Sequence, residues 1–180
     1  MNVLAIGPHP DDIEFGCGGT LLQYASNGSN VDLLVLTCGE IGAPAAIRRR
    51  EQEKSAAIMG ARGLYWGGFR DTRIPSDMRL IGKIESVMSK SNPDMVLVNA
   101  TNDLHQDHRA AANAASTASR YVKRVLYYEV PTSQFFNPDV FVDITSVIEK
   151  KVRLLEAHKS QVDKTRVEGL TIMESAHSCA

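Results

Sequence analysis

The sequence predicts an α/β fold, namely a Rossmann-like, doubly wound and mostly parallel sheet with helices on both of its faces. Two observations carry this prediction. The apolar runs at 3–7, 31–37 and 95–98 are almost continuous, and such runs are typical of strands that are buried on both faces of a parallel sheet. Helical patterns alternate with these runs through short connections, which is the order that βαβ units produce.

The expected elements follow one another along the whole chain, without an internal repeat, a low-complexity stretch or a linker that would divide it. Strands are expected at 2–7, 31–37, 63–66, 95–99, 124–130 and 139–143. Helices are expected at 18–28, 46–60, 77–91, 107–120 and 145–160. We therefore expect one domain over residues 1–180.

Glycines and turn-forming residues indicate where several of these elements begin and end. The glycine pair at 18–19 is expected to open the first helix, with Thr20 near its start, and Asn-Gly at 27–28 is expected to close it. Gly60 is expected to end the second helix, and Ser-Asn-Pro-Asp at 91–94 turns the chain into the fourth strand.

The composition excludes several classes of partner. With 43% hydrophobic and 23% charged residues, the chain is an ordinary globular protein. Its formal net charge of -1 gives no polycationic surface, so we expect neither nucleic acid nor an anionic membrane as a partner. No apolar stretch approaches the roughly 20 residues that span a bilayer, and no basic signal-peptide region precedes the first strand.

The cysteines indicate a reducing compartment. Cys17, Cys38 and Cys179 are odd in number and lack C-x-x-C spacing, so we expect free thiols and a cytoplasmic location. The densest basic run is Arg-Arg-Arg at 48–50. Two interpretations of it stay open, a solvated helix start and a substrate contact.

Two polar motifs follow two of the expected strands. Pro-His-Pro-Asp-Asp at 8–12 comes directly after the strand at 2–7, and His-Gln-Asp-His at 105–108 comes shortly after the strand at 95–99. Doubly wound sheets bind ligands beyond the carboxyl ends of their strands, where the strand order reverses. If the order is 3-2-1-4-5, that position lies between these two strands, and we expect the motifs to meet there.

The residue types of the two motifs suit metal-assisted hydrolysis. Two imidazoles and one carboxylate are a common ligand set for catalytic zinc, which polarises a carbonyl group. Hydrolysis also needs a general base and a donor to the oxyanion. Of Asp11 and Asp12, one can bind the metal while the other faces the water. His105 and His108 can divide the work in the same way, and Asp107 can fix the tautomer of a neighbouring imidazole.

Structural interpretations compete with this one when each feature is taken alone. Paired aspartates usually cap a helix, and the lone histidines His158 and His177 are expected to be structural or surface residues. Gly-Cys-Gly-Gly at 16–19 lacks the G-x-G-x-x-G spacing of a dinucleotide site, so we attribute these glycines to close packing between helix and strand. The joint position of the two His/Asp motifs is what favours a functional site.

The motifs at 8–14 and 105–108, together with Gly-Gly-Thr at 18–20, resemble those of the PIG-L/LmbE-like zinc N-deacetylases. This family includes the N-acetylglucosaminyl-phosphatidylinositol deacetylases and the deacetylases of mycothiol and bacillithiol biosynthesis. The similarity extends over nearly the whole chain. Weaker matches are Gly-Glu-Ile-Gly at 39–42, Arg48 with Glu51 before a helix that ends at Gly60, and His-Lys-Ser-Gln at 158–161.

The resemblance implies a role for each motif residue. It implies zinc ligands at His9, Asp12 and His108. It implies that Asp11 is the general base that deprotonates the attacking water and later passes a proton to the amine. It implies that His105 stabilises the oxyanion and that Asp107 orients His105. It also implies that Arg48 and Asp71 hold sugar hydroxyls, with Arg49 or Arg50 as the alternative to Arg48 if the register differs.

The chain departs from the family pattern in two places. Some members carry a tyrosine two residues before the first histidine of the second motif, where this chain has Asp103, so the assistance to the leaving group differs. Relatives also usually continue past residues 175–178 into a segment that walls the site. Three interpretations stay open: a natural short form, a fragment, or a homo-oligomer in which a neighbouring subunit supplies that wall.

These observations lead to one hypothesis with two rivals. We expect a hydrolase with a Zn²⁺ cofactor, or another divalent ion such as Fe²⁺, that removes acetyl from a small-molecule substrate of the N-acetylglucosamine type. Acetate and a free amine would be the products. The rivals are an amidase that cleaves a larger acyl group from an amino-sugar conjugate, and a catalytically idle module that binds metal or sugar.

Overall fold

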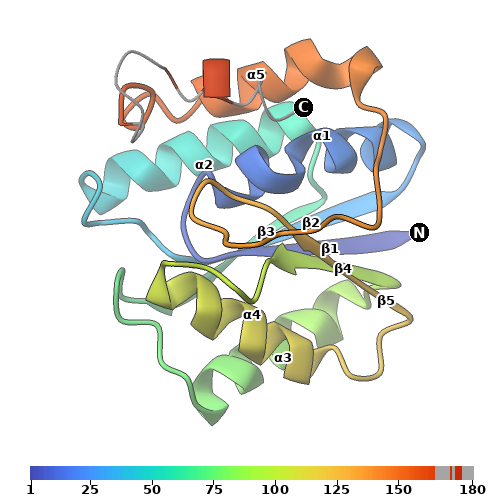
Figure 1. The fold of residues 1–180 in the computed structure, drawn as a ribbon, viewed down its shortest axis with the longest axis vertical. Helices are drawn as coiled ribbons and strands as arrows, with labels where there is room; N and C mark the ends of the chain where they lie inside the picture. The colour runs from blue at the N-terminus through green and yellow to red at the C-terminus, as the bar shows by residue number, and fades with distance from the viewer. Residues whose placement is uncertain (165–170, 172, 176–180) are drawn as a thin grey trace.

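The computed structural model describes residues 1–164, 171 and 173–175. These residues form a parallel sheet with the strand order β3-β2-β1-β4-β5. This sheet confirms the expected α/β fold, and its strand order is the one on which the meeting of the two motifs depends (Figure 1). The strands are β1 (Asn2–Gly7), β2 (Asn30–Thr37), β3 (Gly63–Phe69), β4 (Met95–Asn99) and β5 (Arg124–Tyr128).

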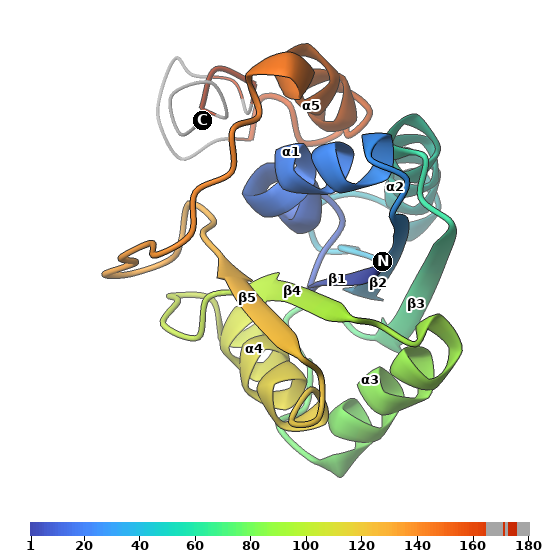
Figure 2. The same ribbon diagram turned by 90° about the vertical axis from the view of Figure 1, so that its right-hand side faces the viewer.

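Helices cover both faces of this sheet. They are α1 (Asp12–Ser26), α2 (Ala45–Met59), α3 (Met78–Ser91), α4 (Gln106–Ala118) and α5 (Ile148–Glu156). Figure 2 shows α1, α2 and α5 on one side of the sheet and α3 and α4 on the other. The chain is therefore doubly wound, as the alternation of elements predicts.

The two layers explain why the strands are apolar throughout. Val3 and Ala5 of β1 belong to the core on the side of α1 and α2, whereas Leu4 and Ile6 belong to the core on the side of α3 and α4. Successive side chains of a strand point to opposite faces, and both faces of β1 are buried. From Val3 to Ile6 the sequence of β1 is therefore apolar, and polar residues do not alternate with apolar ones.

The expected start of the first helix is wrong. α1 begins at Asp12 and not at 18, so Gly19 and Thr20 lie inside the helix and do not mark its start. The glycines have a packing role instead. A Cβ atom on Gly16 would lie 2.2 Å from Cδ2 of Tyr128 on β5, and one on Gly19 would lie 2.8 Å from Cδ1 of Ile144. The helix needs these glycines so that its neighbours can approach closely.

The expected strand at 139–143 is also wrong, because these residues join no strand ladder. Val140 is 58% and Phe141 is 82% exposed, so the apolar run is not buried against a sheet face. The expected helix at 145–160 is shorter. A 3₁₀ turn at Thr145–Val147 precedes α5, which ends at Glu156. Bonds from the amides of Ala157 and His158 to carbonyls three residues earlier tighten its last turn.

Other features of the described residues bear on the remaining expectations. None of the described helices has both the length and the apolar character needed to cross a membrane. Cys17 is buried, Cys38 is half-buried, and both are free thiols. Cys179 and His177 lie outside the described residues.

Candidate metal centre and active site

The two motifs meet at the carboxyl edge of the sheet, because β1 and β4 are adjacent parallel strands. The first motif fills the connection between the end of β1 at Gly7 and the start of α1 at Asp12. The second lies where the connection after β4 enters the first turn of α4. Topology thus brings together segments that are far apart in the chain.

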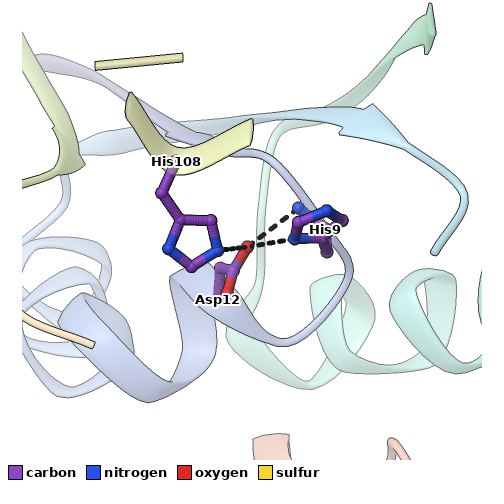
Figure 3. A group of neighbouring side chains, drawn as sticks. All are labelled: His9, Asp12 and His108. Carbon is purple, nitrogen blue, oxygen red and sulfur yellow. Dashed lines mark hydrogen bonds and ion pairs between the residues drawn. The ribbon is translucent and has the colours of Figure 1, made fainter. Parts of the chain in front are cut away.

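His9, Asp12 and His108 form a compact cluster. Figure 3 shows their side chains pointing toward one another, with the Asp12 carboxylate between the two imidazoles. Oδ2 of Asp12 lies 3.1 Å from Nδ1 of His9 and 3.4 Å from Nε2 of His108. One ligand atom from each residue lies within 4.8 Å of the other two, so the three can hold one metal ion.

Each imidazole has an inner nitrogen, which faces Asp12, and an outer nitrogen, which faces away from it and lies close to a carboxylate. Nε2 of His9 lies 3.2 Å from Oδ1 of Asp71 and 3.2 Å from Oδ2 of Asp107. Nδ1 of His108 lies 3.1 Å from Oδ2 of Asp103. A proton on each outer nitrogen leaves the inner nitrogen as a lone-pair donor, which is the usual arrangement around histidines that bind metal. The residues present therefore fit a divalent cation.

His9, His105 and Asp107 also lie close enough to hold an ion, but this group is less suitable. The carboxylate of Asp107 is fully buried and accepts hydrogen bonds from the backbone amides of Thr72, at 2.8 Å, and Ile74, at 3.2 Å. It also faces Nε2 of His9. Because these donors already satisfy both oxygens, Asp107 serves better as a support for His9 than as a ligand.

The electrostatics of the cluster follow from its close pairs of opposite charge. Burial lowers the pKa of His108, but Asp12 and Asp103 outweigh it and raise the pKa to about 9. Burial also lowers the pKa of His9, but hydrogen bonds to Asp107, Asp12 and Asp71 raise it well above its ordinary value. Burial raises the pKa of Asp12, but the two imidazoles hold it well below its ordinary value. A bound cation would take the place of imidazole protons.

Asp11 lies beside the cluster in an unusual backbone conformation. It is the residue before α1 and has φ 89° and ψ -27°. Its Oδ2 accepts a hydrogen bond of 3.1 Å from Nη2 of Arg48, whose side chain is only 3% exposed. Burial raises the pKa of Asp11 and outweighs the opposing effect of Arg48. A carboxylate with a raised pKa is suited to accept a proton as a general base.

Arg48 is the arginine of the basic run that reaches this site. The guanidinium of Arg49 lies over Trp66, 4.7 Å from the centre of the ring, and donates to Sγ of Cys38. Arg50 is exposed. The expected contact between Arg48 and a sugar stays a prediction.

His105 stacks on His108, with the ring centres 4.8 Å apart, and meets His9 edge-on at the same distance between ring centres. Burial and the charges of these two neighbours lower its pKa. Its Nδ1 accepts from the backbone amide of Asp107 at 3.2 Å, so the neutral ring carries its proton on Nε2. The amide of Asp107 thus makes the hydrogen bond to His105, and the expected role of Asp107 in orienting His105 stays a prediction.

Asp71 joins the loop after β3 to the loop after β2. Its Oδ2 accepts a hydrogen bond of 3.0 Å from the amide of Ile41, and its own amide donates to Oε1 of Glu40 at 2.9 Å. Its Oδ1 faces His9. In the structure Asp71 therefore supports His9, and its expected contact with sugar hydroxyls stays a prediction.

Sequence reasoning did not assign a role to several residues that the site contains. Asp103 supports His108 and lies in the loop after β4, as His105 does. Its position shortly after an apolar strand, which is the signal that identified His105, would also have identified Asp103. Glu14 and His158 are both fully buried, and Nε2 of His158 lies 3.8 Å from Oε1 of Glu14. Burial lowers the pKa of His158, but Glu14 outweighs it and the net pKa is raised. No spacing in the sequence indicates this pair.

Comparison with known proteins agrees with the geometry. The sequence model of the PIG-L family, described as GlcNAc-PI de-N-acetylase, matches residues 4–119. YaiS of Escherichia coli K12, named an uncharacterized deacetylase, is 34% identical over 167 residues, which cover 88% of this chain and 90% of that protein. The diacetylchitobiose deacetylase of Thermococcus kodakarensis is 33% identical over 185 residues, which cover 88% of this chain and 69% of that protein.

Solved structures share the same fold. The crystal structure of the conserved protein TT1542 from Thermus thermophilus superposes with a TM-score of 0.90 at 26% sequence identity. The match covers 99% of this chain and 86% of that one. The overall fold is therefore common to both proteins.

Proposed function

Because the chain belongs to the PIG-L family, we propose that it is a zinc-dependent N-deacetylase that acts on an N-acetylglucosamine-type substrate. Two relatives in sequence are named diacetylchitobiose deacetylase and probable N-acetyl-α-D-glucosaminyl L-malate deacetylase 2. The substrate class of this chain is inferred from those names, and zinc is inferred from the ligand set of two imidazoles and one carboxylate.

One observation carries the proposal. The inner nitrogens of His9 and His108 converge on Asp12, while the outer nitrogens meet carboxylates. Asp11 and His105 stand beside this cluster without belonging to the ligand set of His9, Asp12 and His108. A site that only stored or sensed a metal would need neither a carboxylate of raised pKa nor a third imidazole. Hydrolysis of an amide needs both.

The residues of this chain supply the proton transfers. When bound, zinc would polarise the acetyl carbonyl and lower the pKa of the attacking water. Asp11 takes a proton from that water as its oxygen adds to the carbonyl carbon. The Nε2 proton of His105 is donated in a hydrogen bond to the oxyanion that forms. The C–N bond then breaks as Asp11 returns the proton to nitrogen, and acetate and the free amine leave.

Two residues are proposed to meet the sugar. Nε and Nη1 of Arg48 have no hydrogen-bond partner among the described residues, but both atoms are buried, so a sugar hydroxyl would reach them only if the neighbouring loops moved. Asp71 is itself buried, but its carboxylate accepts from the amide of Ile41, a residue that is 72% exposed. A sugar ring between them would place its 2-acetamido group toward His9 and Asp11.

The test is amine release from N-acetylglucosamine and diacetylchitobiose by protein reconstituted with zinc. Asp11→Asn should lose at least about 10³-fold in kcat, since the base is removed, while about one zinc per chain is retained. Asparagine tolerates the positive φ of this position, so the backbone is preserved. His108→Ala should lose the metal itself. Ser89→Ala, at an exposed position of α3, is the matched control.

Each alternative gives a different result in this assay. Turnover that persists in Asp11→Asn contradicts the mechanism. Release of longer acyl groups but not of acetyl identifies an amidase of different specificity. Stoichiometric zinc binding with no amine release from any N-acyl amino sugar contradicts the enzyme assignment and favours a binding module.

A further inference from the structure

The backbone at Asp11 is held in a conformation that the chain does not favour. Its φ of 89° is in the left-handed region, which residues with a side chain adopt only at a cost in free energy. Such conformations persist where the surrounding contacts fix them, and they occur often at functional sites. The contacts that hold Asp11 therefore control where its carboxylate lies.

A first set of contacts runs through Arg48 of α2. Its Nη2 donates to the carbonyl oxygen of Pro10 at 2.6 Å and to Oδ2 of Asp11 at 3.1 Å, so it fixes both the peptide bond and the carboxylate. Gly39 leaves room for the guanidinium, because a Cβ atom there would lie 2.9 Å from Nε of Arg48. Nη1 of Arg48 is 3.8 Å from Oε2 of Glu51, one turn further along α2.

A second set of contacts runs through Gln52. Its Oε1 accepts a hydrogen bond of 3.4 Å from the backbone amide of Asp11, and its Nε2 donates to Oε1 of Glu14 at 2.6 Å. The same Glu14 oxygen is 3.8 Å from Nε2 of His158. Gln52, Glu14 and His158 are all fully buried, so this path has no water-exposed member that would weaken it.

Both sets of contacts end on the same segment after α5. His158 ends the path through Gln52. Ser160 ends the path through Arg48, because its amide and its hydroxyl donate to the two carboxylate oxygens of Glu51, each at 2.7 Å. No hydrogen bond or ion pair found among the described residues joins His158 or Ser160 to the three proposed metal ligands. The contacts of this segment therefore lead toward Asp11 through Glu14 and Glu51.

We propose that His158 and Ser160 are positioning residues, which hold Asp11 in its strained conformation through Glu14–Gln52 and Glu51–Arg48. The inference rests on the proposed role of Asp11 as the general base. It assigns to His158 and Ser160 a function in catalysis, although both follow α5 and lie outside the two His/Asp motifs.

The test compares four variants of the zinc-reconstituted protein. His158→Leu removes the ring that faces Glu14, and His158→Gln restores a side-chain N–H donor at that place. Ser160→Ala removes one hydrogen bond to Glu51 and keeps the other, so it should fold even if His158→Leu does not. Lys159→Ala changes an exposed residue between them and is the matched control.

Three quantities are measured for each variant: kcat and KM for amine release, zinc per chain, and the amide hydrogen-exchange rate of Asp11 by NMR. His158→Leu should lower kcat by about 10- to 100-fold, the effect of a displacement of roughly 1 Å at the reacting atoms. KM should stay within about 2-fold and zinc content should be unchanged. Ser160→Ala should show a smaller loss of kcat, and His158→Gln should recover most of it. Exchange at Asp11 should become faster in step with the loss.

The outcomes separate this inference from the proposed function. If a folded His158→Leu and Ser160→Ala both keep the wild-type kcat and the wild-type exchange rate at Asp11, the inference is overturned. It is also overturned if kcat falls only in proportion to lost zinc or to lost folded protein. If the wild type releases no amine, the proposed function fails, while the exchange rate still shows whether His158 and Ser160 hold Asp11.

Discussion

Asp103 shows how one carboxylate can order a metal centre without binding the metal. It is buried, and its two oxygens serve different groups. Oδ1 accepts from the amide of His105 at 2.8 Å, and Oδ2 lies 3.1 Å from Nδ1 of His108 and accepts from Ser133. It thus fixes both the ring orientation of a proposed ligand and the start of α4. Carboxylates in this position raise the basicity of the imidazole that binds the metal.

Replacing Asp103 should therefore weaken zinc binding without removing a ligand. We expect Asp103→Asn to reduce the affinity for zinc by about 10-fold, the low end of the effect of such supporting residues, as measured by competition with a chromophoric chelator. Asp139→Asn, at an exposed position, should bind zinc as the wild type does. Equal affinities in the two variants would mean that Asp103 does not tune His108.

At the scale of single elements, α1 shows why element boundaries were harder to predict than the elements themselves. Gly18 and Gly19 carry the signal of a helix start, but α1 passes through them because Ile144 and Leu154 pack against the helix there. The predicted close packing between helix and strand agrees with the contact of Gly16 with Tyr128 of β5. Gly18 and Gly19 instead pack against residues outside the strands. The helix in fact starts at Asp12, within the first motif. The paired aspartates are interpreted there as catalytic and metal-binding residues, and the competing interpretation as a helix cap is the one that indicates the helix start.

The glycines of α1 and α3 allow a paired test of this packing argument. A Cβ atom on Gly16 would lie 2.2 Å from Tyr128 and 2.8 Å from the backbone oxygen of Glu129. Gly16→Ala should therefore lower the free energy of unfolding by about 1–3 kcal/mol, as overpacking does. A Cβ atom on Gly82 would contact nothing within 4 Å, and Gly82→Ala in α3 should raise the free energy of unfolding by about 0.5–1 kcal/mol.

Urea denaturation of both variants measures the two effects against one reference. The structural account requires shifts of opposite sign, because both residues are helical glycines and only their neighbours differ. Two stabilised variants would mean that α1 can move away from β5 at no cost.

At the scale of the whole molecule, the order of the strands is what assembles the site. The apolar runs and their alternation with helices could be predicted because they depend on the sequence locally. The order 3-2-1-4-5 was only assumed from the doubly wound class, and this order places the two motifs together. Which side chain meets which could not be predicted in the same way. The contacts of Asp107 with His9, of Asp103 with His108 and of His158 with Glu14 depend on side-chain directions.

The segment at 139–143 marks the limit of pattern reasoning at this scale. Its sequence has strand character, but a strand needs a partner edge, and exposed Val140 and Phe141 show that these residues are not buried against the sheet. Whether a segment pairs with a neighbouring strand depends on the folded molecule as a whole, so it could not be predicted from the local sequence.

The assembly of the site from distant segments has a consequence for stability. The proposed ligands come from two distant motifs, with His9 and Asp12 in the motif at 8–12 and His108 in the motif at 105–108, so the ligand set does not exist in the unfolded protein and a metal ion binds only the folded state. Zinc should then raise the free energy of unfolding of the metal-free protein by about 2.7 kcal/mol when free zinc is 100 times its dissociation constant. Denaturation in zinc buffers of graded concentration measures this, and a chelator should reverse it. His108→Ala should show little of this stabilisation, because it keeps only one of the two imidazole ligands that β1 and α4 supply to the site. Equal stabilisation of the wild type and His108→Ala would show that zinc acts elsewhere on the chain, and the split site would then be wrong.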